Sequence, residues 1–273
     1  MLTKNTFKDA LKELGLEKGD TVFVQSDLFR IGLVENTKTP LEICDFYYDN
    51  LMEYLGEKGT ICVLTFFGDY GKKGIEFDRA SSPSLSGLFS EYIRSKRESI
   101  RSEHPIYSIT SIGENAEHIS GGNHLDGFGW DSPWGRLHRI NSKIMNLGYG
   151  IRADGFTFMH YIENMFGVPY QYNKPYNIKT FNNGIEVKKL YTLSVRYLDY
   201  DIEYDYKYVK DKLIKENIIK NINLGSAEAL LCDSCTVFEE VCKILSINRY
   251  ALLEKKPNFI IGKIPFDSMQ MSE

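Results

Sequence analysis

The sequence predicts an α/β protein with a central sheet and a smaller C-terminal α+β portion. Strand-like and helix-like segments alternate in the first part of the chain. Two runs of buried-strand type, residues 21–24 and 60–64, end in polar or glycine-containing segments. After Pro169 the composition shifts to Tyr, Lys, Ile and Asn. We therefore expect an α/β core over residues 1–170 and a smaller α+β subdomain over residues 171–273, which closes a cleft on the core.

Capping residues and apolar periodicity place the individual elements. Residues 6–14 carry apolar side chains at helical spacing, with Thr6 as the expected cap and Gly15 as the stop. Pro40 marks the start of a second helix that closes at Gly56. The later expected elements are a helix from the Ser82-Pro83 cap to about Lys96, strands near residues 107–112 and 143–147, a helix over 156–166, and a strand–turn–strand around Asn182-Asn183-Gly184.

Charge and composition exclude several classes of protein. The chain carries 33 Lys or Arg and 37 Asp or Glu, with a formal net charge of −4, and therefore offers no basic surface for a nucleic acid. No signal peptide and no apolar run of the ~18 residues that span a membrane are present, so we expect a cytoplasmic protein without a membrane partner. Its five cysteines are scattered and odd in number, which favours reduced thiols. A homo-oligomer is compatible with this composition.

His160 and Glu163 form the most informative local pair. They lie three residues apart on an expected helix and are therefore neighbours on one face. A histidine suits a general base near neutral pH, and a carboxylate beside it fixes its tautomer and stabilises the imidazolium. Spacing alone is more typical of an exposed or hydrogen-bonded structural pair, with a catalytic pair as the alternative that stays open at this point.

Other polar segments have both a functional and a structural interpretation. Arg101-Ser102-Glu103-His104-Pro105, Asp131-Ser132-Pro133-Trp134-Gly135-Arg136 and Gly68-Asp69-Tyr70-Gly71 could line a pocket, or their side chains could satisfy local backbone donors. The Tyr-rich stretch 197–208 is typical of a half-exposed surface, with a share in a substrate wall as the alternative.

The sequence lacks the common metal and nucleotide motifs. Cys232-Asp233-Ser234-Cys235 has the spacing of half a zinc site or a redox dithiol, but no second pair completes it, which favours a strand followed by a capped helix. A metal-dependent hydrolase using His104 and His160 would need a ligand spacing that is absent. The standard phosphate-binding glycine motifs are also absent. We therefore expect no metal site.

An ordered series of short motifs covers about residues 6–175. It consists of Gly15-Leu16, Gly19-Asp20-Thr21-Val22, Val24-Gln25-Ser26, Gly59-Thr60, Phe77-Asp78, Ser82-Pro83-Ser84, Arg101-Ser102-Glu103-His104-Pro105, Asp131-Ser132-Pro133-Trp134-Gly135-Arg136-Leu137, Leu147-Gly148 and Thr157-Phe158-Met159-His160-Tyr161-Ile162-Glu163. In this order and spacing the series resembles the aminoglycoside 3-N-acetyltransferase family. Any one of these motifs alone would be weak evidence.

The resemblance implies an α/β/α sandwich and an N-acetyltransferase that uses acetyl-CoA, or another acyl-CoA, as co-substrate and an amino sugar as acceptor. It implies that His160 is the catalytic base and Glu163 the residue that orients it. A family aspartate after the second strand matches Asp69, although extra residues there mean that Asp78 could be confused with it. A family glutamate in a C-terminal strand corresponds less closely to Asp199.

The cofactor side of the cleft departs from the family pattern. The residues expected to bind the acyl-CoA are Ser26, Asp27, Arg30, Ile31, Ser102, His104 and Ser108. Relatives usually read His-Ser-Ser where this chain reads Gln25-Ser26-Asp27, and Asp27 would add negative charge near the cofactor's phosphates. Ser26 and neighbouring backbone amides remain candidates for oxyanion donors. The departure also supports an alternative function, a catalytically inactive CoA- or sugar-binding protein of the same fold.

The acceptor is open between two kinds of amino sugar. The loop over residues 66–74 and the Tyr- and Lys-rich C-terminal part resemble family members associated with surface-polysaccharide synthesis rather than antibiotic resistance. Lys72, Lys73 and Arg79 are expected to border the amine pocket, where they would repel a polycationic aminoglycoside and suit the diphosphate of a nucleotide-linked amino sugar. In the structural alternative these cations point into water.

Overall fold

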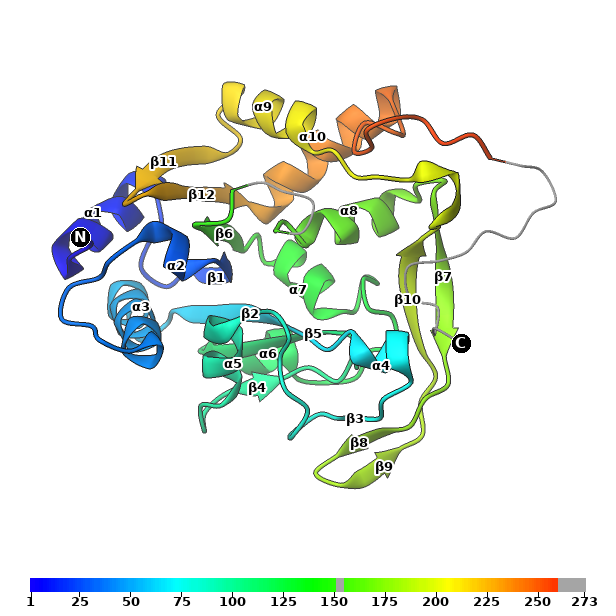
Figure 1. Ribbon diagram of the computed structural model, residues 1–273, viewed down its shortest axis with the longest axis horizontal. Helices are drawn as coiled ribbons and strands as arrows, with labels where there is room; N and C mark the ends of the chain where they lie inside the picture. Colours follow the sequence, from blue (N-terminus) through cyan, green and yellow to red (C-terminus); the bar gives the residue numbers. More distant parts are fainter. Residues whose placement is uncertain (151–154, 260–273) are drawn as a thin grey trace.

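A seven-stranded sheet forms the centre of the molecule in the computed structural model, which describes residues 1–150 and 155–259 (Figure 1). From one edge to the other its strands are β11 (Lys220–Leu224), β12 (Ala227–Asp233), β6 (Lys143–Leu147), β1 (Thr21–Ser26), β2 (Thr60–Phe66), β5 (Tyr107–Gly113) and β4 (Ile100–Arg101). Strand β1 pairs in parallel with β2 and β6, whereas the pairs β2–β5, β5–β4, β6–β12 and β12–β11 are antiparallel. The sheet is therefore mixed, with a parallel centre.

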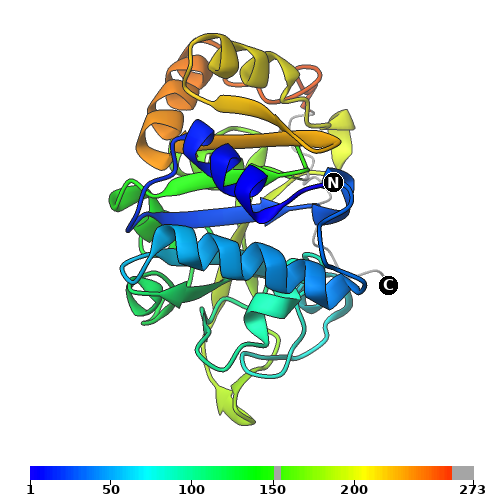
Figure 2. The same cartoon turned by 90° about the vertical axis from the view of Figure 1, so that its left-hand side faces the viewer.

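Helices cover both faces of this sheet. One face packs against α1 (Lys4–Leu14), α2 (Leu28–Ile31), α3 (Pro40–Leu55) and α5 (Leu88–Arg94). The other packs against α6 (Ala116–Ser120), α7 (Pro133–Arg139), α8 (Phe158–Phe166), α9 (Lys207–Lys215) and α10 (Ser234–Ile247). Figure 2 shows α1 and α3 lying across the strands on the first face. The arrangement is an α/β/α sandwich, as the resemblance implied.

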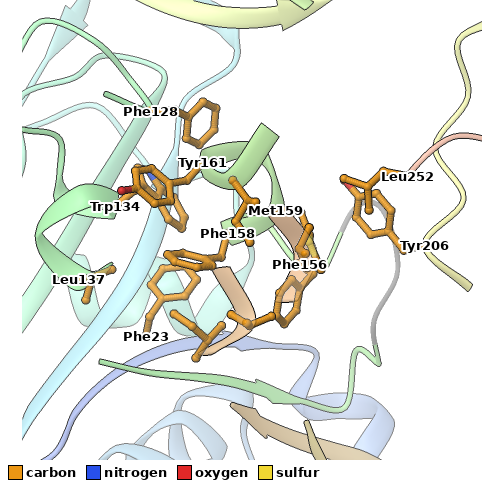
Figure 3. Packing of buried hydrophobic residues seen from close by; sticks show 14 of the residues in the cluster. Phe23, Phe128, Trp134, Leu137, Phe156, Phe158, Met159, Tyr161, Tyr206 and Leu252 are labelled. Atoms are coloured by element: carbon orange, nitrogen blue, oxygen red, sulfur yellow. The ribbon is translucent and has the colours of Figure 1, made fainter. Parts of the chain in front are cut away.

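The alternation of side chains along the strands divides the core into two parts. In β1, Val22 and Val24 point to the cluster beneath α1 and α3, whereas Phe23 points to the cluster beneath α7 and α8. Phe23 contacts Trp134 of α7 with ring centroids 4.9 Å apart. Figure 3 shows Phe158 of α8 in this second cluster, close to Phe23 and Trp134. The first turn of α8 is thus fixed to the sheet by aromatic packing.

Residues after 170 contribute to the central sheet as well as to smaller ones. Strands β11 and β12 complete its edge, and α10 packs on its face. The smaller sheets consist of β7 (Gln171–Tyr176) with β10 (Tyr191–Arg196), and of β3 (Phe77–Asp78) with β8 (Thr180–Asn182) and β9 (Ile185–Val187). The boundary expected at residue 170 therefore does not separate two sheets, because β12 pairs with β6.

Most element ends agree with the sequence, with two differences. Helix α1 begins at Lys4 because Thr3 is the cap, in reciprocal hydrogen bonds with Thr6. Ser82 does not cap a helix: its hydroxyl accepts the backbone N–H of Asp78 in a turn, and α5 begins only at Leu88. The strand followed by a helix that was expected at Cys232 and Cys235 is confirmed by β12 and α10.

The helices are short and the cysteines are unpaired. Within the residues that the structure describes, no helix is long and apolar enough to cross a membrane. The cysteines, which are Cys44, Cys62, Cys232, Cys235 and Cys242, all carry free thiols.

Candidate active site

His160 lies on the first turns of α8, on the helix side that is not packed into the core. Its neighbours Met159 and Tyr161 are fully buried, which fixes the orientation of the helix. The imidazole Nδ1 lies 2.8 Å from Oε2 of Glu163, whose side chain is completely buried, while 18% of the His160 side chain is exposed. The structure thus brings together the pair that the spacing predicted.

The Glu163 carboxylate is surrounded by hydrogen-bond donors. The Tyr170 hydroxyl donates to Oε1 over 2.7 Å, and Gln171 Nε2 donates to Oε2 over 3.0 Å. Because a carboxylate can only accept, the His160 Nδ1 must also donate, and it therefore carries a proton in the neutral ring. This leaves the lone pair on Nε2, as a general base requires.

Two cavities meet at this imidazole. The larger, with a volume of ≈ 650 Å³, lies beyond the carboxyl ends of β1 and β2 and includes Ser26, Phe66, Tyr107 and Thr157 in its walls. The smaller, ≈ 130 Å³, is bounded by Tyr107, Phe128, Gln171, Leu193, Ser194, Val195, Arg196 and Tyr204. His160 and Tyr107 line both. A ligand in either cavity would therefore lie beside His160.

The larger cavity contains part of the loop that follows β1. Ser26 and Asp27 line it, and the Asp27 carboxylate pairs with Arg30 over 2.9 Å. Gln25 exchanges two hydrogen bonds with Thr157, donating from Nε2 over 3.0 Å and accepting from the backbone N–H at 2.9 Å. Gln25 therefore ties β1 to the start of α8, and the negative charge of Asp27 has a cationic partner.

One protein family accounts for most of the chain. The sequence model described as aminoglycoside 3-N-acetyltransferase matches residues 23–246. The chain belongs to this family. The matched range includes every strand of the central sheet except the start of β1, together with α8 and its His160.

Curated relatives of the family match over a shorter range. The SPbeta prophage-derived aminoglycoside N(3')-acetyltransferase-like protein YokD of Bacillus subtilis is 30% identical over 191 residues, 62% of this chain and 66% of that protein. Aminoglycoside N(3)-acetyltransferase VII of Streptomyces paromomycinus is 25% identical over 187 residues, 62% of each protein. These matches span just under two thirds of the relatives' own lengths.

Solved structures in the family share the fold. AAC-IIIb in a binary complex with CoASH superposes with a TM-score of 0.77 at 19% identity, covering 94% of this chain and 99% of that one. The crystal structure of YokD gives a TM-score of 0.73 at 24% identity, with coverage of 90% and 100%. The α/β/α fold implied by the family resemblance is confirmed.

Three residues expected to bind the family's acyl-CoA are buried outside both cavities. The Ser102 hydroxyl accepts the backbone N–H of Ile109 over 2.9 Å, and the Ser108 hydroxyl donates to the Thr65 carbonyl over 2.8 Å. His104 accepts the backbone N–H of Tyr107 over 3.1 Å. All three side chains are fully buried, and their hydrogen bonds tie β5, which carries Tyr107, to β2 and to the segment after β4. Ile31 is likewise a core residue.

The buried histidines His104 and His124 are neutral in the folded protein. Their rings are stacked with centroids 6.1 Å apart. Burial lowers the pKa of His104 to about 3 and that of His124 to about 4. His104 is therefore an uncharged ring that forms hydrogen bonds in the core.

Three acidic candidates for the catalytic site, which are Asp69, its alternative Asp78 and Asp199, do not line either cavity. Asp69, at the start of α4 (Asp69–Lys73), pairs with Lys73 over 3.2 Å. Asp78 accepts the backbone N–H groups of Ala80 and Gly184 in a loop contact. Asp199 lies in a 3-10 helix (Asp199–Asp201), after β10 has ended at Arg196, rather than in a strand. In the described part of the chain, no cluster of His, Cys, Asp and Glu could hold a metal.

Sequence reasoning missed several residues that meet at His160. Tyr170 and Gln171 follow α8 and contact Glu163, and Tyr204 lies with its ring centroid 5.4 Å from that of His160. The Tyr-rich stretch 197–208 was the available signal for Tyr204. Nothing local distinguished Gln171, whose contacts depend on how β7 and β10 pair.

Proposed function

We propose that this protein transfers an acetyl group from acetyl-CoA to the amino group of an amino sugar, with His160 as general base. The observation that carries the proposal is the position of His160 between two cavities, with Nδ1 bound to a buried carboxylate. A base there can reach an amine in one cavity while that amine faces an acyl donor in the other. Relatives named as aminoglycoside N-acetyltransferases support the same reaction class.

The residues supply the steps that the chemistry needs. Acetyl-CoA, when bound, supplies the thioester carbonyl that the amine attacks. An amino-sugar nitrogen is largely protonated at neutral pH, so His160 Nε2 accepts a proton from it, and Glu163 stabilises the imidazolium. The proton can then pass to the departing thiolate. Ser26, in the wall of the larger cavity, is a candidate donor to the developing oxyanion.

The larger cavity fits the mixed chemistry of a pantetheine arm. Its walls combine apolar side chains, including Leu64, Phe66 and Phe89, with the hydroxyls of Ser86 and Thr157. A pantetheine arm alternates methylenes with amides, which need surfaces of both kinds. Since Arg30 pairs with Asp27, the departure from the family's His-Ser-Ser pattern leaves no isolated negative charge at this loop. These features support acetyl-CoA as the co-substrate.

For the acceptor we favour a nucleotide-linked amino sugar over an aminoglycoside. An enzyme for polycations gains affinity and encounter rate from carboxylates around the amine. In the described part of the chain the lining of the smaller cavity includes Arg196, whose guanidinium also pairs with Glu203 over 3.4 Å, and no carboxylate. Lys72 and Lys73 lie on α4 away from this lining, and Lys73 pairs with Asp69, so the cationic residue beside the smaller cavity is Arg196 rather than the two expected lysines.

Two measurements test the reaction and the base. Thiol release from acetyl-CoA is followed with a panel of nucleotide amino sugars and with gentamicin- and kanamycin-type compounds. His160→Ala should lower turnover at least ~10²-fold, while calorimetry shows unchanged acetyl-CoA binding. The exposed His118→Ala variant is the matched control. Turnover of His160→Ala within threefold of the original protein would remove His160 from this role.

The same assays separate the alternatives. Higher kcat/KM on a nucleotide amino sugar than on the aminoglycosides supports the proposed acceptor, and the reverse order overturns it while leaving acetyl transfer in place. Binding of acetyl-CoA without thiol release on any amine would instead identify a catalytically inactive binding protein.

A further inference from the structure

The side-chain amide of Gln171 has a fixed orientation. Its Nε2 lies 3.0 Å from Oε2 of Glu163 and 2.9 Å from the hydroxyl oxygen of Tyr204. A carboxylate accepts hydrogen bonds and cannot donate, so the NH₂ group of Gln171 must face Glu163. The amide oxygen then points the other way, where it accepts from the Ser194 hydroxyl over 2.9 Å. Both amide hydrogens are therefore used, one on Glu163 and one on Tyr204.

This orientation determines what the Tyr204 hydroxyl can do. Its oxygen accepts from Gln171, and an amide nitrogen cannot accept in return, so the hydroxyl hydrogen is left for another partner. Among the described residues, Gln171 is the one that bonds this hydroxyl. Burial raises the pKa of Tyr204 well above its ordinary value, so the proton stays on the oxygen at working pH.

The Tyr204 side chain is also held in place. Its ring lies against that of His160, with centroids 5.4 Å apart, and the Arg196 guanidinium lies over the Tyr204 ring, 5.3 Å from its centre. Its backbone forms an isolated bridge with Leu253. Tyr204 lines the smaller cavity with His160 but is not part of the wall of the larger one. A neutral donor is therefore fixed on the acceptor side of the proposed base.

We propose that the Tyr204 hydroxyl, oriented by Gln171, donates a hydrogen bond to an oxygen of the acceptor substrate next to the amine that is acetylated. The inference rests on the proposed function and adds a substrate-binding residue to it. A donor directed at the amine lone pair would compete with attack on the thioester, so an oxygen is the suitable partner. Amino sugars commonly carry a hydroxyl on the carbon beside the amine, and this hydroxyl can accept.

The test compares two neighbouring tyrosines, of which one lines the smaller cavity and the other does not. Tyr204→Phe removes the proposed donor and keeps the ring. Tyr206→Phe is the matched control, because Tyr206 lies beside Tyr204 with ring centroids 5.6 Å apart and its buried hydroxyl has no hydrogen-bond partner. Each variant is assayed by thiol release with the best acceptor of the nucleotide amino-sugar panel and with its analogue deoxygenated at the carbon beside the amine. Thermal melting verifies that both variants fold.

The expected result is a substrate-dependent loss. Tyr204→Phe should lower kcat/KM for the hydroxylated acceptor about 10- to 100-fold, the cost of leaving one polar group without its partner. Its kcat/KM for the deoxy analogue should stay within threefold of the original protein, as should its KM for acetyl-CoA. Tyr206→Phe should match the original protein on both acceptors.

Two results would overturn the inference. One is an unchanged kcat/KM of Tyr204→Phe on the hydroxylated acceptor. The other is an equal loss on both acceptors, which would indicate a role towards the thioester or the fold. Failure of the proposed function is recognised separately, since the original protein would then transfer acetyl to no amine of the panel, and the inference would fall with it.

Discussion

Replacing Glu163 by Gln would change the charge beside His160 and little else. The carboxylate accepts from His160 Nδ1 and Gln171 Nε2 at Oε2, and from the Tyr170 hydroxyl at Oε1. An amide oxygen in the Oε2 position keeps the first two hydrogen bonds, and the amide NH₂ can then donate to the Tyr170 oxygen. Glu163→Gln should therefore preserve the imidazole tautomer while removing the negative charge.

The expected loss of kcat in Glu163→Gln follows from the distance between the carboxylate and the imidazole. The lost interaction is the attraction between the carboxylate and the imidazolium that His160 becomes during transfer. Two unit charges ~4 Å apart attract by ~4 kcal/mol at an effective dielectric constant of about 20. Each ~1.4 kcal/mol lost from the transition state slows the reaction about tenfold, so kcat should fall about 10³-fold. The free energy of unfolding should change less, because the amide avoids the cost of burying a charge and this offsets its weaker hydrogen bonds.

Thiol release with a saturating acceptor measures kcat, and urea unfolding measures stability. The exposed Glu13→Gln variant on α1 is the control for loss of a carboxylate elsewhere. A folded Glu163→Gln protein whose kcat lies within threefold of the original would refute the electrostatic role. A loss of stability as large as the kinetic effect would instead make Glu163 a structural residue.

Two other sites give further predictions. Burial lowers the pKa of His104 to about 3 and that of His124 to about 4, so both are neutral in the folded protein. Below the ordinary histidine pKa, the unfolded chain therefore binds more protons than the folded protein. The free energy of unfolding should thus fall by ~4 kcal/mol from pH 7 to pH 5, as measured by urea unfolding. His124→Asn should halve this decrease, and an unaltered decrease between the two pH values would contradict the prediction. Asp69 lies outside both cavities and pairs with Lys73, so Asp69→Asn should leave turnover within threefold of the original protein, and a tenfold loss would place this carboxylate in the acceptor site after all. Asp78→Asn should lower the melting temperature without affecting turnover, because Asp78 accepts backbone N–H groups that hold its loop.

The sequence alone determined the features that depend on neighbouring residues. Gly15 ends α1 in a left-handed conformation, and Pro40 opens α3. The His160–Glu163 contact followed from a spacing of three on a helix. Cap residues and side-chain periodicity act over a few residues, so these features can be predicted without knowing what packs against them.

Only the tertiary structure decided which distant residues meet. Tyr170 and Gln171 reach Glu163 because the chain turns back into β7 after α8. Tyr204 reaches His160 because the segment after β10 lines the smaller cavity beside it. The same pairings bury Ser102 and His104 rather than exposing them to a cofactor. Strand pairing and side-chain packing between segments far apart in sequence set these contacts, and no local pattern encodes which strand will lie beside another.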